Sequence, residues 1–135
     1  MTEQHPTERP LLVAVIGAGP VGLAAAAHLI DQGIEPLVLE AGPQVGASVR
    51  EWGHVRVFSP WEFNIDPASR KLLDAANWSE PGKQDYPTGQ ELIDRYLVPL
   101  SKTTELAPVI EYGARVAAIG RRGIDKEVSR DRELH

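Results

Sequence analysis

Residues 13–40 read VAVIGAGPVGLAAAAHLIDQGIEPLVLE, and this stretch decides the fold. It begins inside an apolar run, Leu11 to Ile16, which is rich in β-branched residues and predicts a strand buried on both faces of a parallel sheet. The helical segment that follows is predicted to end at Gly33, because glycine is common just past the end of a helix. Residues 37–39 predict a second buried strand. The succession of strand, helix and strand predicts a βαβ unit.

Three glycines join the first strand to the helix with the spacing G-x-G-x-x-G. Gly17 permits a tight turn out of the strand, and Gly19 lets the backbone approach a pyrophosphate because it has no Cβ. Gly22 lets the helix pack closely on the strand. Pro20 lies in the first helical turn, where the absence of an N–H does not weaken the helix. The free N–H groups of that turn are suited to binding phosphates.

An acidic residue, Glu40, closes the second strand 23 positions after Gly17. In dinucleotide-binding βαβ units an acid about 20 positions on accepts hydrogen bonds from ribose hydroxyls. The same acid disfavours a 2′-phosphate, so NADP is a poor candidate for this site. The glycines and Glu40 together predict a dinucleotide-binding site.

The composition is typical of a soluble globular protein, with 42% hydrophobic and 24% charged residues. The net charge of −5 argues against a nucleic-acid partner. No apolar run reaches the roughly 18 residues of a membrane helix, and the polar start lacks the apolar core of a secretory signal. We therefore expect a cytoplasmic protein without membrane contacts. The sequence holds no cysteine and its four histidines are scattered, so we expect no metal site.

The chain is expected to form one domain between two tails. We expect a flexible tail over residues 1–10, an α/β Rossmann-like domain over residues 11–120, and a charged arm or tail over residues 121–135. The domain is a parallel sheet with helices, and it is expected to be incomplete. A complete fold of this kind has two mononucleotide-binding halves, and the sequence supplies the first half with an insertion.

Several segments of this domain are predicted from local patterns. Residues 41–50 predict a loop, residues 109–112 a third strand, and residues 115–119 the start of another strand. Asp66 is a predicted N-cap for a helix that runs through Ala76.

A second helix of the insertion begins at a capping box. Thr88 and Glu91 have the T-x-x-E spacing of such a box and predict a helix with an apolar face. Pro99 is expected to kink that helix or to end its regular part.

Three features of the sequence occur together in one protein family. They are GAGPVG at 17–22 with LEAG at 39–42, the segment from VGAS at 45–48 to VFSP at 57–60, and YPTG at 86–89 with ARV at 114–116. With them the chain resembles the N-terminal part of an FAD-dependent oxidoreductase, and most of all a flavin-containing monooxygenase. The resemblance spans residues 11–135. The absence of an early cysteine pair disfavours the disulfide-reductase branch.

This resemblance implies a cofactor and a set of residues. The implied cofactor is FAD, held by its ADP moiety, with NAD(P)H as co-substrate of a longer parent enzyme. The implied cofactor-binding residues are Gly17, Ala18, Gly19, Pro20, Val21, Gly22, Glu40, Ala41, Gly42 and Val116, the last at the adenine. Catalytic residues are unknown. His54, Arg56 and Ser59 lie where such relatives approach the isoalloxazine, but a surface-loop role is favoured for each.

Two other functions stay open at this point. The chain could be a non-catalytic dinucleotide-binding module or truncated remnant, or the NAD-binding domain of a dehydrogenase. The insertion at 41–108 favours a flavoprotein over the dehydrogenase. The expected order in the sheet is third strand, second strand, first strand, which leaves one edge of the first strand open beside Val13 and Val15. Such an edge predicts a homo-oligomer or a strand swap.

Overall fold

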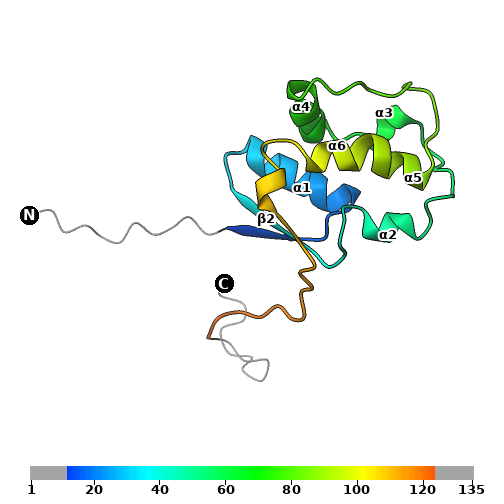
Figure 1. Cartoon of the computed structure of the whole chain (residues 1–135). Helices are drawn as coiled ribbons and strands as arrows, with labels where there is room; N and C mark the ends of the chain where they lie inside the picture. Colours follow the sequence, from blue (N-terminus) through cyan, green and yellow to red (C-terminus); the bar gives the residue numbers. More distant parts are fainter. Residues whose placement is uncertain (1–11, 124–135) are drawn as a thin grey trace, which may run out of the picture.

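The computed structural model describes residues 12–123 of the chain and contains a three-stranded parallel sheet (Figure 1). The strands, in sheet order, are β1 (Val13–Ile16), β2 (Pro36–Glu40) and β3 (Ile110–Tyr112). The register pairs Glu40 with Tyr112 at the carboxyl end of the sheet. The predicted strand order and the Rossmann-like fold class are confirmed, and the described strands form the first half of such a sheet.

Helix α1 (Pro20–Asp31) connects β1 to β2 and contacts both strands and α4, and its buried residues are Leu23, Ala26 and Ala27. Pro20 occupies the first turn, as the sequence predicts. The helix ends beside Gly33, whose φ of +73° is a left-handed conformation that glycine adopts without strain. The predicted βαβ unit is therefore confirmed in its order and in both helix ends.

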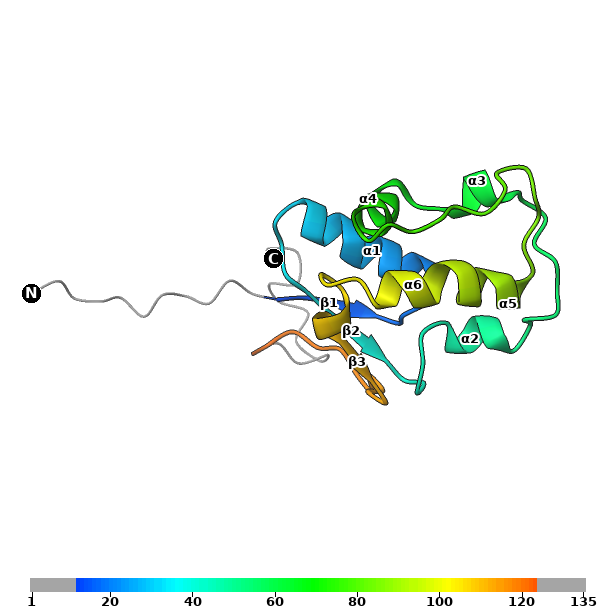
Figure 2. The same cartoon turned by 45° about the horizontal axis from the view of Figure 1, so that its top comes forward.

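A layer of short helical segments follows β2 and lies with α1 on the same side of the sheet (Figure 2). The segments are α2 (Ala47–Arg50), α3 (Trp61–Asn64), α4 (Pro67–Ala75), α5 (Gly89–Leu92), the π-helical η1 (Ile93–Leu97), α6 (Val98–Ser101) and the 3₁₀-helical η2 (Ala107–Val109). The predicted caps are present, since the side chains of Asp66 and Thr88 accept hydrogen bonds from Ser69 N and Glu91 N. The core lies between this layer and β2, and it includes Leu23, Val38, Trp61, Leu73, Tyr96, Leu97 and Leu106.

The helix of the 89–101 segment is irregular because of Pro99. In a regular α-helix residue 99 would donate to the carbonyl of Arg95, but proline has no N–H. The indole Nε1 of Trp78 donates to that carbonyl instead, at 2.8 Å. The turns before Pro99 form the π-helical segment η1, which is a common outcome where the regular ladder is interrupted. The prediction that Pro99 disturbs this helix is confirmed.

Two predictions about local structure are wrong. The predicted loop over residues 41–50 contains α2, which begins after Gly46 in a left-handed turn of φ +68°. A helix of four residues is too short for its hydrophobic period to be recognised in a sequence. The strand predicted over residues 115–119 is not formed: Ala114 N still donates to Glu40 O, but the chain then leaves the sheet. The predicted tail 1–10 and residues 124–135 of the predicted arm lie outside the described residues.

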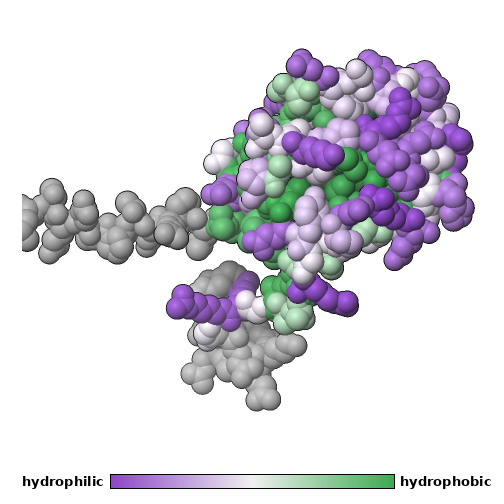
Figure 3. Space-filling view, viewed as in Figure 1, coloured by the Kyte–Doolittle hydropathy of each residue, from purple (hydrophilic) through white to green (hydrophobic). Residues whose placement is uncertain are grey.

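Strand β1 is also less buried than the sequence predicts. Val13 is 40% exposed and Ile16 is 55% exposed, whereas Val38 in the neighbouring β2 is fully buried. Within residues 12–123, β1 has a neighbour on one edge alone, which accounts for the difference. The space-filling view has hydrophobic surface over the sheet and mostly hydrophilic surface over the helical layer (Figure 3). Among the described residues, the edge of β1 that was predicted to be open therefore has no partner strand.

Candidate functional site

The glycine loop between β1 and α1 is a tight turn. Gly17 has a φ of +99°, and its N–H donates to Leu39 O at 2.8 Å. A Cβ on Gly22 would lie 1.8 Å from the carbonyl oxygen of Gly17, so no other residue fits there without movement. The roles predicted for Gly17 and Gly22 follow from this geometry.

Gly19 has open space where its side chain would be. A Cβ at this position would meet no atom within 4 Å, and the residue caps α1 in an extended conformation. The neighbouring Val21 is 83% exposed. The start of the twelve-residue helix α1 is therefore accessible to a ligand that approaches the backbone.

The side chain of Glu40 lies at the centre of the site and is 9% exposed. Its Oε1 accepts a hydrogen bond from Ala18 N at 2.9 Å, and its Oε2 accepts one from Gly42 N at 2.7 Å. The carboxylate thus joins the glycine loop to the loop after β2. Each oxygen has a second lone pair that these two bonds leave unused.

Backbone hydrogen bonds hold the surrounding loops in place. Gly46 N donates to Ala18 O at 2.9 Å, and Gly113 N donates to Gly42 O at 3.0 Å. Gly42 is also closely packed, because a Cβ on it would lie 2.6 Å from the Cβ of Ala47. The ends of all three strands are consequently tied to one another.

A cleft of about 610 Å³ opens at these carboxyl ends, and we call it the Glu40 cleft. It is lined by Ile16, Gly17, Leu39, Glu40, Ala41, Gly42, Ala47, Ser48, Glu51, Ala114, Arg115 and Val116. The structure therefore brings Val116 to the same cleft as Glu40, although 76 positions separate them in the sequence. Ligand sites of open α/β sheets lie at this end of the strands.

Part of the predicted set is beside the cleft rather than in its wall. Ala18, Gly19, Pro20, Val21 and Gly22 belong to the loop and first turn next to it. Sequence reasoning missed Ala47, Ser48 and Glu51, which reach the cleft because α2 forms within the predicted loop. It also missed Arg115, and the one indication of this residue in the sequence was its position next to Val116.

His54, Arg56 and Ser59 are not in the Glu40 cleft. The guanidinium of Arg56 donates a hydrogen bond to Tyr86 O, and the backbone of Arg56 forms an isolated antiparallel β-bridge with Thr88. Ser59 Oγ donates to Asn64 Oδ1 at 3.1 Å. Arg56 and Ser59 thus have local structural contacts, in agreement with the loop role favoured for them.

The groups with shifted pKa values lie in and around the helical layer and do not line the Glu40 cleft. Burial alone would raise the pKa of Asp66, but hydrogen bonds from Ser69 N and His28 lower it below its usual value. A paired hydrogen bond from Arg70 lowers the pKa of Glu80. Burial raises the pKa of Tyr96. These shifts mark structural contacts around α4.

Two features are absent from residues 12–123. No cluster of three His, Cys, Asp or Glu side chains there could hold a metal ion. No helix in the same range has both the length and the apolar character needed to cross a membrane.

A comparison with protein families decides the relationship. The sequence profile described as pyridine nucleotide-disulphide oxidoreductase matches residues 14–133. The chain belongs to this family. As a family member it lacks a dithiol within its own sequence, because the chain has no cysteine.

Individual relatives of this oxidoreductase-family chain include a monooxygenase and a reductase. It is 31% identical to putative flavin-containing monooxygenase 2 of Arabidopsis thaliana over 79% of the chain and 22% of that protein. Among solved structures it is similar to OTEMO in complex with FAD and NADP, with 25% identity, a TM-score of 0.58, and coverage of 82% of this chain and 21% of the other. It is also similar to the bacillithiol disulfide reductase Bdr from Bacillus cereus, with 26% identity, a TM-score of 0.63, and coverage of 83% and 31%.

These comparisons confirm the resemblance to flavin-containing monooxygenases. They also give the chain's extent relative to its relatives, since it spans between about a fifth and a third of the length of the three proteins named.

Proposed function

We propose that the chain binds FAD through its ADP moiety in the Glu40 cleft. The observation that carries the proposal is the position of the Glu40 carboxylate, held between Ala18 N and Gly42 N in the same cleft as Val116. The solved relative OTEMO, with the same fold, has FAD bound.

Different residues in and beside the cleft suit different parts of FAD. The space at Gly19 and the free N–H groups at the start of α1 suit a pyrophosphate. The unused lone pairs of Glu40 suit the ribose hydroxyls, which are hydrogen-bond donors. The backbone near Val116, which belongs to no helix or strand, suits the adenine edge. FAD, when bound, supplies the redox chemistry, and the chain's own residues bind and orient it.

We further propose that the chain is the FAD-binding part of a monooxygenase-like flavoprotein that uses NAD(P)H. Support comes from the similarity to flavin-containing monooxygenase 2 and from the NADP in the OTEMO complex. The residues of the Glu40 cleft bind the inert end of the cofactor under this proposal. We therefore assign no catalytic acid or base to the described residues.

A titration with FAD tests the binding proposal on the full 135-residue chain. We expect saturable quenching of flavin fluorescence, and we expect ADP to compete because it contains the part of FAD that the cleft would hold. Binding of NAD in preference to FAD would contradict the proposal. That result would favour the NAD-binding domain of a dehydrogenase, which the glycine motif and Glu40 also suit.

A second measurement separates an enzyme from a binding module. NADPH oxidation under air is followed in the FAD-loaded chain. FAD binding without turnover would favour the non-catalytic module, and turnover would favour a catalytic unit. Both outcomes are informative because the binding titration is done on the same sample.

A further inference from the structure

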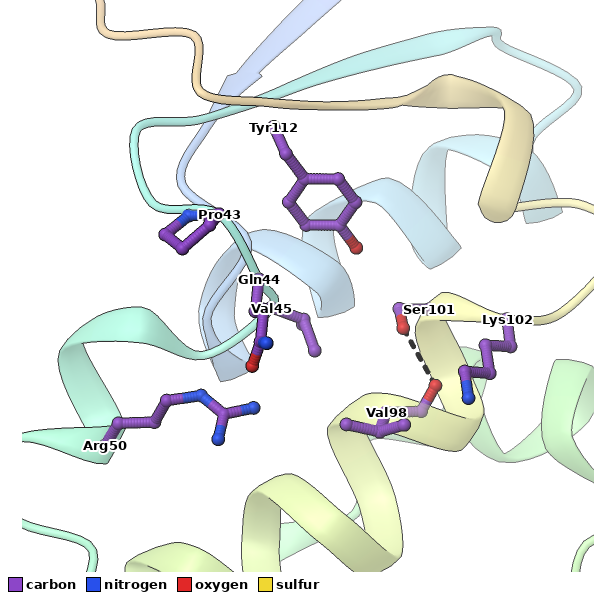
Figure 4. Close-up of a pocket in the computed structure, with 8 residues that line it drawn as sticks. All are labelled: Pro43, Gln44, Val45, Arg50, Val98, Ser101, Lys102 and Tyr112. Atoms are coloured by element: carbon purple, nitrogen blue, oxygen red, sulfur yellow. Dashed lines mark hydrogen bonds between the residues drawn. The ribbon is translucent and has the colours of Figure 1, made fainter.

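A second cavity of about 370 Å³ lies between α2, α6 and the end of β3, and we call it the α2–α6 pocket (Figure 4). It is lined by Pro43, Gln44, Val45, Arg50, Val98, Ser101, Lys102 and Tyr112. Its volume is within the range of small-molecule sites in proteins. The lining residues come from three separate parts of the chain, so the pocket is a product of tertiary folding.

The polar side chains of this pocket are mostly hydrogen-bond donors. Arg50 extends from the end of α2 and Tyr112 from β3 toward the same space, with Gln44 beside them, and Lys102, which directly follows α6, lines the opposite side next to Ser101 and Val98 (Figure 4). Guanidinium and ammonium groups donate and never accept, and the phenol and amide can each donate as well. A ligand that accepts several hydrogen bonds fits this set.

The two cations have no partner of opposite charge in the part of the chain that the structure describes. Neither Arg50 nor Lys102 forms an ion pair there, and the lining residues include neither Asp nor Glu. Other cations of the same domain are paired, as Arg70 is with Glu80 and Lys71 with Asp31. In a chain of net charge −5, two unpaired cations at one cavity mark a local excess of positive charge.

The remaining wall is apolar. Val45 is buried and Val98 is half-buried, and the ring of Tyr112 covers the side nearest the sheet. An apolar wall beside a group of donors suits a ligand with an oxyanion at one end and an organic group at the other.

We propose that the α2–α6 pocket binds the phosphate group of a small organic phosphate ester. A phosphate offers three or more acceptor oxygens and matches a guanidinium fork together with a point-like ammonium group. A carboxylate has two oxygens and would leave part of this donor set unused. The site is distinct from the Glu40 cleft, with which it shares no lining residue.

The test is an NMR titration of the ¹⁵N-labelled full chain with phenyl phosphate at constant ionic strength. We expect saturable shifts at the amides of residues 44–45, 101–102 and 112, with a Kd on the order of 1 mM. Inorganic phosphate should bind more weakly because it cannot use the apolar wall. Benzoate is the carboxylate probe, and equal affinity for it would overturn the assignment of phosphate.

Two variants and one control locate the binding. R50Q and K102Q should each raise the Kd about tenfold, since each removes a charged donor from an exposed site. K83Q removes an exposed lysine outside the pocket and should leave the Kd unchanged. An unchanged Kd in the R50Q/K102Q double variant would overturn the proposal, as would shifts confined to residues 17–22. An FAD titration of the double variant keeps the two sites apart, because FAD binding should be retained.

Discussion

The Glu40 carboxylate accepts a 2.9 Å hydrogen bond from the backbone N–H of Ala18, and so joins the end of β2 to the loop that follows β1. The second oxygen of the same carboxylate accepts a 2.7 Å bond from Gly42 N. The side chain therefore has a structural role in the folded chain that is separate from any ligand. A variant at this position should change both stability and binding.

Glu40→Gln should lower the free energy of unfolding by about 1–3 kcal/mol. The glutamine keeps the shape of the side chain, but its amide N–H₂ must face one of the two backbone N–H groups. Urea denaturation measures the change. Glu111→Gln is the matched control, because Glu111 is an exposed carboxylate on β3. Equal stability of both variants would show that the two hydrogen bonds contribute little.

Under the proposed function, Glu40→Ala should also weaken FAD binding by about 1–3 kcal/mol.

Alanine at two glycines of the loop should separate folding from binding. Gly22→Ala places a Cβ 1.8 Å from Gly17 O, so we expect a loss of stability of about 1–3 kcal/mol or more. Gly19→Ala meets open space and an extended backbone, so its stability should stay within about 0.5 kcal/mol of the original chain. Its FAD affinity should fall, since the methyl group occupies the approach to the α1 N–H groups. Thermal unfolding and FAD titration measure the two effects. A stable Gly22→Ala variant would contradict the close packing of Gly22 on Gly17.

The hydrogen bond from Trp78 to Arg95 O should depend on Pro99. Trp78→Phe removes the donor, and we expect a loss of about 1 kcal/mol in the original chain. In a Pro99→Ala background the backbone N–H gained at position 99 can donate to Arg95 O, so the same substitution should have a smaller effect. A double-mutant cycle measures this difference and cancels the packing that Trp78 also loses. Simple additivity of the two substitutions would disprove the link.

The contribution of Asp66 to stability should depend on pH. Its pKa is lower in the folded chain than in the unfolded one, so its contribution is present above the unfolded pKa of about 3.9 and is lost as pH falls through the folded value. The stability difference between the original chain and Asp66→Asn should therefore shrink between about pH 5 and pH 3. Urea denaturation across this range measures it. Asp74→Asn, at an exposed position of the same helix, is the matched control substitution.

We propose that the open edge of β1 lets two copies of the chain associate. Val13 N and Gly17 N donate toward β2, so the alternate residue Ala14 has its N–H directed to the free edge. Ala14→Pro removes that donor while it leaves the β1–β2 ladder intact, and it should reduce self-association. Light scattering after size-exclusion chromatography at low micromolar concentration measures the mass. A monomer in the original chain would count against this association.

The sequence predicted the parts of the molecule that depend on local geometry. The turn at Gly17, the close approach at Gly22 and the cap at Asp66 each follow from one residue and its near neighbours. The strand order was predictable as well, because right-handed βαβ connections leave few alternatives. The position of Val116 in the cleft came from family resemblance alone.

The remainder depends on contacts between distant segments. The hydrogen bond from Ala18 N to the Glu40 carboxylate joins residues 22 positions apart, and no sequence pattern predicts it. Helix α2 follows Gly46, which packs against the distant Ile93 and Leu97, and its four residues are too few to show a hydrophobic period. The α2–α6 pocket needs three segments to meet, and its cations taken singly are indistinguishable from ordinary surface residues.

The fixed carboxylate of Glu40 has a consequence for the speed and strength of ligand capture. Its rotamer is already selected by two backbone N–H groups, and the loops around it are already joined by hydrogen bonds. A ligand with hydroxyl donors therefore meets a preorganised acceptor and does not have to order a mobile side chain on arrival. Binding to an exposed glutamate is usually weakened because its side chain loses conformational entropy. The Glu40 side chain has already lost this entropy when the chain folds.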